Sequence, residues 1–222
     1  MATKKLTAPA SLTDEIADVV RQRILNGDYE IGEKIKENLI AEELNVSRTP
    51  IREAFKILEN EGLIDYVPNR GCFSRGFTKQ DIDDIYQSRE ALEELAVKWA
   101  SERINDEEIK KLEEHCDLME FYTEREDVKK VLEMNGEFHD IIYNAARSRF
   151  LAQVLRLYKE YLDRTRKYIN YDKEYLDGIL QEHRAIMEAL RIRNSQMAIA
   201  AIRAHMEASQ ARAEKHWHIR EA

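Results

Sequence analysis

The chain has 222 residues, of which 43% are hydrophobic and 35% are charged. That apolar share is enough for a packed core and excludes a disordered chain, and no apolar run is long enough for a transmembrane helix. The formal net charge of −8 argues against a protein that coats nucleic acid through bulk positive charge. The two cysteines are too few for a disulfide scaffold. The first residues do not resemble a secretory signal, so we expect a cytoplasmic protein.

Proline and glycine divide the chain near residue 76. All three prolines and five of the seven glycines lie in the first 76 residues. Because these residues are the main breakers of helices, the stretch before residue 76 is predicted to be mixed and turn-rich, and the stretch after it almost entirely helical. We therefore predict two domains, residues 1–76 and residues 77–222, in a mainly α protein.

The first domain is predicted to hold three helices and then a hairpin. Amphipathic spacing and terminal glycines indicate helices over 12–26, 37–44 and 48–61, with Ser47 as the cap of the third. Two short β-rich runs, 63–67 and 72–74, flank the turn residues 68–71. Two helices, a tight turn, a third helix and a hairpin form a winged helix-turn-helix.

The third helix has one apolar face and one basic face. Arg48, Arg52 and Lys56 recur every four residues, with Thr49 beside them. A helix of this kind suits the major groove, where arginine can donate two hydrogen bonds to guanine. Arg70, at the hairpin tip, could reach a neighbouring groove or phosphate. The alternative is an ordinary solvated helix face. Residues 1–75 carry 11 basic and 13 acidic side chains, so we expect base contacts and dimerisation to matter more than a general basic field.

The second domain is predicted to be an all-α antiparallel helical bundle. The periodicity indicates six helices, and the short connections between them imply antiparallel neighbours. The predicted spans are 78–103, 106–124, 126–147, 150–170, 173–193 and 195–218.

Three histidines are predicted to point into this bundle from three different helices. His139, His183 and His205 each share a helix face with apolar residues, and Asn135 lies one turn before His139. A single such histidine is usually a core residue with a satisfied hydrogen bond. If three histidines converge, each buried ring needs a hydrogen-bond partner or a metal. A site with three imidazole ligands and open coordination positions on the metal suits zinc or nickel. An open metal position would invite a carboxylate effector, and Arg89 is the candidate to pair with it. The alternative for Arg89 is a surface or intersubunit salt bridge.

The stretch Val46-Ser-Arg-Thr-Pro-Ile-Arg-Glu-Ala54 resembles the signature of GntR-type bacterial transcription regulators. By this resemblance Arg48, Thr49 and Arg52 would contact an operator, and Gly71 would let the backbone of the wing approach DNA. Asn38 stands where the family often has an arginine that contacts DNA.

The helical part resembles the FadR-like branch with its FCD effector domain, through 83–93, Glu137-Phe-His139, Glu182-His183 and His205-Met206. That branch typically holds a divalent metal through an aspartate and three histidines, and Asn135 stands at the aspartate position. Six helices favour the VanR-like group.

The sequence therefore predicts a homodimeric, effector-responsive regulator, most simply a repressor, that binds a two-fold operator and responds to a small organic acid. One alternative is a helical-bundle metalloenzyme fused to a DNA-binding head. The chain lacks the Glu-x-x-His pairs of di-iron bundles and any His-Glu-x-x-His, so we do not expect an enzyme. The other alternative is a DNA-binding adaptor without a small-molecule effector.

Overall fold

The computed structural model describes residues 11–76, 78–165 and 171–214, and it is mainly α-helical, as predicted. The described residues form two compact units that separate between Asp81 and Ile82. We call these the N-terminal unit and the C-terminal unit. The predicted domain boundary after residue 76 lies between the end of the last strand at Ser74 and the start of the next helix at Lys79.

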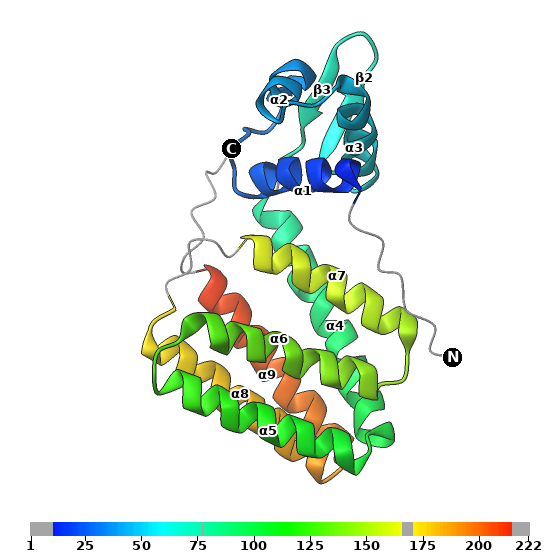
Figure 1. Cartoon of the computed structure of the whole chain (residues 1–222). Coiled ribbons are helices and arrows are strands. Elements are labelled where there is room, and N and C mark those ends of the chain that lie inside the picture. The colour runs from blue at the N-terminus through cyan, green and yellow to red at the C-terminus, as the bar shows by residue number, and fades with distance from the viewer. Residues whose placement is uncertain (1–10, 77, 166–170, 215–222) are drawn as a thin grey trace, which may run out of the picture. The chain divides into compact units, whose positions relative to one another are not determined.

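The N-terminal unit has the predicted order of three helices and a hairpin, together with one strand that the sequence analysis missed. Its elements are α1 (Leu12–Leu25), β1 (Lys34–Ile35), α2 (Glu37–Glu43), α3 (Arg48–Asn60), β2 (Ile64–Val67) and β3 (Gly71–Ser74). The three strands form an antiparallel sheet in the order β1-β3-β2 (Figure 1). This is a winged helix-turn-helix.

Helix α1 packs on α3 through buried apolar side chains from both helices. Val20, Ile24, Ile51 and Leu58 are at most 1% exposed. Ser11 caps α1 in a reciprocal capping box with Asp14. Ser47 is the residue before α3, as predicted, but its side chain makes no capping hydrogen bond, so that part of the prediction is wrong.

Six helices follow in the described part of the chain, in agreement with the prediction: α4 (Lys79–Arg103), α5 (Asp106–Thr123), α6 (Val128–Ala145), α7 (Arg149–Thr165), α8 (Lys173–Arg191) and α9 (Ser195–Glu214). The ends of two predicted spans, 166–170 and 215–218, lie outside the described residues. Helix α5 packs on α6 and α8, and α8 packs on α9 (Figure 1). None of the helices in the described ranges is long and apolar enough to cross a membrane.

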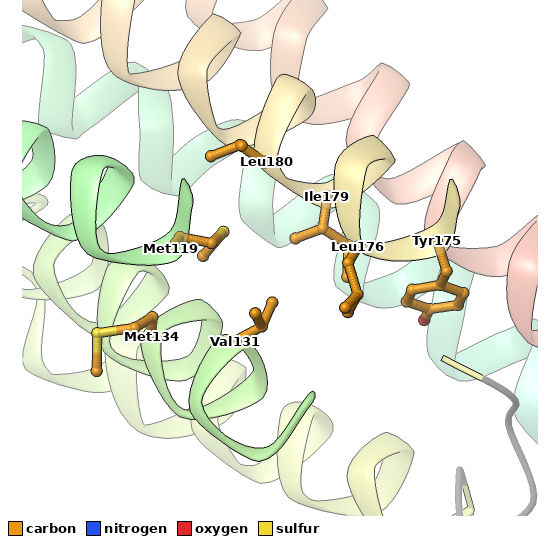
Figure 2. Close-up of a cluster of buried hydrophobic side chains, with 7 residues drawn as sticks. All are labelled: Met119, Val131, Met134, Tyr175, Leu176, Ile179 and Leu180. Atoms are coloured by element: carbon orange, nitrogen blue, oxygen red, sulfur yellow. The ribbon is translucent and has the colours of Figure 1, made fainter. Parts of the chain in front are cut away.

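An apolar cluster holds α5, α6 and α8 together. It consists of Met119, Val131, Met134, Tyr175, Leu176, Ile179 and Leu180 (Figure 2). A second cluster joins α4, α6 and α7 through side chains that include Ala96, Tyr143 and Leu155. Because close packing of this kind fixes the rotation of each helix, it also fixes which polar side chains face the interior.

Candidate functional site

The three predicted histidines converge in the interior of the C-terminal unit. His139 lies on α6, His183 on α8 and His205 on α9, and they are 1%, 0% and 4% exposed. One ring nitrogen from each can be chosen so that all three lie within 4.8 Å of one another. The ring of His183 also stacks on Phe138, with centroids 4.2 Å apart. The helix faces inferred from the sequence are therefore correct.

The ring nitrogens meet in a way that suits a cation. The Nε2 atoms of His139 and His205 are 3.2 Å apart. The Nδ1 atom of His205 donates to a carboxylate, so its Nε2 is left with a lone pair. Neither ring nitrogen of His183 has a hydrogen-bond partner among the described residues. Two imidazole nitrogens that bind one zinc ion at about 2.0–2.1 Å in a tetrahedral arrangement would be roughly 3.3–3.4 Å apart, so the residues present fit a divalent metal.

Burial keeps two of these histidines neutral. Burial lowers the pKa of His205 to about 4, although its hydrogen bond with Glu182 opposes the shift. Burial also lowers the pKa of His183 well below its ordinary value, and the neighbouring histidines add to the effect. A neutral imidazole is the form that binds a metal, so neither ring has to lose a proton at neutral pH.

A carboxylate that the sequence analysis missed stands behind His205. Glu182, on α8, accepts from His205 Nδ1 at 2.8 Å and from Arg212 through two bonds of 2.5 and 2.7 Å. Burial would raise the pKa of Glu182, but the hydrogen bonds from Arg212 and His205 lower it overall. The carboxylate thus fixes both the tautomer and the orientation of His205, which is the usual task of a group behind a metal ligand.

A second carboxylate, Glu93 on α4, lies behind His139. Its Oε1 atom accepts from Arg89 Nε and Nη2 at 3.1 and 2.9 Å and from the Tyr143 hydroxyl at 2.5 Å. The same oxygen is 3.7 Å from Nδ1 of His139. Burial would raise the pKa of Glu93, but attraction to His139 and Arg89 lowers it to about 2. Arg89 is therefore a buried ion-pair residue, and a surface salt bridge is excluded because its side chain is only 4% exposed.

A narrow, partly open pocket lies against His139 and His205. The predicted residues Arg89, Asn135, His139 and His205 all line it. His183 does not line the pocket but lies behind it, next to the other two histidines. The lining also contains charged side chains that the sequence analysis did not single out, namely Lys159, Asp163 and Arg212. The sequence pattern did not distinguish these three residues, because charged residues on helices usually lie on solvent-exposed faces.

In the N-terminal unit, the predicted DNA-contacting side chains Asn38, Arg48, Thr49 and Arg52 are all exposed on α2 and α3. The side chain of Arg52 is 64% exposed, and its Nε donates to Glu37 at 2.9 Å. The basic face of α3 is thus open to solvent, while its apolar face carries the buried residues Ile51 and Phe55.

The remaining predicted DNA-contacting residues lie at the tip of the wing, the hairpin formed by β2 and β3. Arg70 is exposed, and its guanidinium lies 5.7 Å from the ring centroid of Phe73. Gly71 has φ +100°, a conformation that residues with a side chain rarely adopt, and a Cβ there would lie 3.1 Å from Cε of Lys34. The tight turn itself therefore explains the glycine, independently of any approach to DNA.

The winged helix-turn-helix with its exposed basic face, together with the polar pocket of the helical unit, defines a class of protein. This class is the transcription regulator that has a DNA-binding domain and an effector-binding domain. The family model described as "Bacterial regulatory proteins, gntR family" matches residues 12–73, and the FCD domain model matches residues 84–208. The chain belongs to the GntR family of bacterial transcription regulators, and its C-terminal unit is an FCD domain.

Relatives with similar sequences carry corresponding names. The chain is 30% identical over 204 residues to the uncharacterized HTH-type transcriptional regulator YdhC of Bacillus subtilis (strain 168), an alignment that covers 90% of each chain. It is 26% identical over 218 residues to the gluconate operon transcriptional repressor of the same strain, covering 96% of this chain and 89% of the relative. These relatives are transcription regulators, not enzymes, and the chain belongs to their family rather than to the metalloenzymes.

Solved structures share the fold at lower sequence identity. E. coli McbR/YncC has a TM-score of 0.68 at 20% identity and covers 93% of this chain and 99% of its own. A structure described by the words "Lar controls the expression of the Listeria monocytogenes agr system" has a TM-score of 0.70 at 18% identity, covering 94% and 99%. At these identities the likeness supports the fold alone.

Proposed function

We propose that this regulator is a homodimeric repressor that binds a two-fold operator and responds to a small carboxylate effector through a divalent metal. The observation that carries the proposal is the convergence of three buried imidazoles, two of which line a pocket that also contains cationic side chains. Both ring nitrogens of His183 and Nδ1 of His139 lack a hydrogen-bond partner among the described residues. Zinc or nickel would be held by His139, His183, His205 and the amide oxygen of Asn135.

Each group near the pocket has its own task in this proposal. A bound metal would supply a Lewis-acid anchor for the carboxylate. Glu182 orients the ring of His205 from behind through a hydrogen bond, and Glu93 places a negative charge 3.7 Å from Nδ1 of His139. Arg212 lines the pocket while holding Glu182 in place, and Arg89 does the same for Glu93. Arg89 is already paired with Glu93, so any contact of Arg89 with the effector would be shared with that carboxylate.

In the N-terminal unit, Arg48, Thr49 and Arg52 would read base edges or phosphates from α3. Asn38 would add a contact from the start of α2, and Arg70 and Gly71 would approach DNA from the wing. Arginine at a guanine edge contributes about 1–3 kcal/mol of discrimination, and a two-fold operator uses each contact twice. Binding by this small surface would therefore depend on dimerisation.

The test of DNA binding starts from a duplex selected by the wild-type protein from a random pool. Arg52→Ala should weaken binding to that duplex by about 1–3 kcal/mol per half-site and leave the helical content unchanged. Arg125→Ala, which removes an exposed arginine from the C-terminal unit, is the control and should bind as wild type does. If the Arg52→Ala protein binds the duplex with wild-type affinity, the assignment of α3 as the DNA-recognition helix is refuted.

The test of the metal site is the metal content of untagged protein purified without chelator. About one ion per chain is expected, and His183→Ala should reduce it strongly. A protein that holds no metal, and whose stability no carboxylate changes, would instead support the DNA-binding adaptor without an effector.

A further inference from the structure

Strand β1 brings a lysine to the wing from a distant part of the chain. Lys34 pairs with Phe73 of β3, so the two side chains lie on the same face of the sheet. The Cε and Nζ atoms of Lys34 lie 3.1 and 3.6 Å from the position that a Cβ on Gly71 would take. The ammonium group of Lys34 therefore lies beside the tip of the wing, although this residue precedes α2 in the sequence.

A second positive charge lies against the same part of the wing. The guanidinium of Arg70 is 5.7 Å from the ring centroid of Phe73, the residue that Lys34 faces across the sheet. Both cationic side chains are exposed. Two like charges gathered around one residue repel each other, and an anion that contacts both of them relieves that repulsion.

Cations in the N-terminal unit divide into those with a carboxylate partner and those without one. The paired arginines are Arg21, Arg23, Arg52 and Arg75. Within residues 11–76, the lysines and arginines to which the structure gives no carboxylate partner are Lys34, Lys36, Arg48, Lys56 and Arg70. Two of these lie on the basic face of α3, and the other three lie on the wing, on β1 or directly after β1.

The acidic residues close to Lys34 in the chain or in the sheet have other partners. Glu33 accepts from the backbone N–H of Glu30 at 2.9 Å, and Glu37 accepts from Arg52 at 2.9 Å. Asp65 lies on the far side of Phe73 and pairs with Arg75 at 3.9 Å. Water can solvate an exposed ammonium group, so the missing partner alone assigns no role to Lys34. Its position beside Arg70 at the tip of the wing does.

We propose that Lys34 and Arg70 together form a site for a DNA phosphodiester, so that β1 as well as the β2–β3 hairpin contacts the DNA backbone. This inference rests on the operator binding proposed above and adds a contact from a strand outside the hairpin. A phosphate can accept hydrogen bonds from an ammonium and a guanidinium group at once. Because every base pair carries the same phosphates, the site contributes affinity and register but no base preference.

The experiment measures how salt affects DNA binding by the full chain. The probes are a duplex selected by the wild-type protein from a random pool and a second duplex with one contacted guanine replaced. Lys34→Met removes the charge and keeps an apolar stem opposite Phe73. Between about 50 and 200 mM salt, each phosphate contact contributes about 0.9 to the slope of log affinity against log salt concentration, so a dimer that loses two contacts should lose about 1.8. Both duplexes should be weakened by the same factor.

Two control variants separate the local contact from net charge and from packing. Lys110→Met makes the same change of charge at a residue of the C-terminal unit that is 75% exposed, and it should leave the slope as in the wild type. Lys34→Arg keeps the charge on β1 and should also keep the slope. If Lys34→Met does not fold, Lys34→Gln removes the same charge at this exposed position and provides the same comparison.

The outcomes separate this inference from the proposed function. An unchanged slope for Lys34→Met overturns the phosphodiester site and leaves recognition by α3 standing, even if the affinity falls. A loss of affinity confined to the selected duplex also overturns the site, because it would assign Lys34 to a base. If the wild-type protein selects no duplex from the pool, the proposed operator binding and the phosphodiester site fail together.

Discussion

Replacing Arg89 by methionine should destabilise the C-terminal unit far more than the loss of a surface ion pair would. The side chains of Arg89 and Glu93 are 4% and 0% exposed. Without the arginine, Glu93 would remain buried with the Tyr143 hydroxyl and the His139 ring, 3.7 Å away, as its only described partners. Removing one member of a buried pair costs about 3–5 kcal/mol, a large part of the roughly 5–15 kcal/mol that stabilises a typical protein.

The assay is urea-induced unfolding of metal-free protein, followed by far-ultraviolet circular dichroism. The double variant Arg89→Met/Glu93→Gln removes both charges and keeps an acceptor for Tyr143, so it should recover at least half of the lost stability. The control is Arg203→Met, because Arg203 pairs with Glu94 but is 52% exposed, and its loss should cost no more than about 1 kcal/mol. If Arg89→Met costs no more than this control, the ion pair does not have the structural role assigned to it.

Two further predictions concern the N-terminal unit. The first is that Glu37→Gln lowers the protein's preference for the selected duplex over a duplex in which the contacted guanine is replaced, by up to about 1 kcal/mol. The reason is that Glu37 accepts from Arg52 Nε and leaves the two terminal nitrogens of Arg52 for the base. An unchanged ratio of the two dissociation constants would contradict this prediction. Ser11→Ala should cost about 1 kcal/mol of unfolding free energy and Ser47→Ala only a few tenths, since only Ser11 makes a capping hydrogen bond. Urea titration of both variants checks the order, and a larger loss for Ser47→Ala would reverse the argument.

Hydropathy periodicity was sufficient to predict the helices, because each helix buries one continuous stripe of side chains. The third helix illustrates this, since Ile51, Phe55 and Leu58 are all buried, as their spacing predicts. Strand β1 was missed because it has only two residues, Lys34 and Ile35, which is too short for an alternating pattern. It is held in the sheet by its pairing with β3, a contact between distant parts of the chain that local patterns do not encode.

The histidines of the candidate site could be predicted from the sequence, and the groups behind them could not. Each histidine is flanked by apolar residues at helical spacing, which shows that it points inward. Glu93 follows Arg89 by four residues, a spacing that is equally common in exposed ion pairs on helices, so the pattern gives no sign that this pair is buried. The contact of Glu182 with Arg212 joins α8 to α9 and depends on how those two helices pack.

The two carboxylates also connect the candidate site to the surrounding helices of the C-terminal unit. Glu182 connects α8 to His205 and Arg212 on α9, and Glu93 connects α4 to Tyr143 and lies near His139 on α6. A ligand that moves the imidazoles therefore acts on polar contacts that join four helices. Helix α4, which carries Glu93, is also the helix in which the boundary between the two units falls, between Asp81 and Ile82.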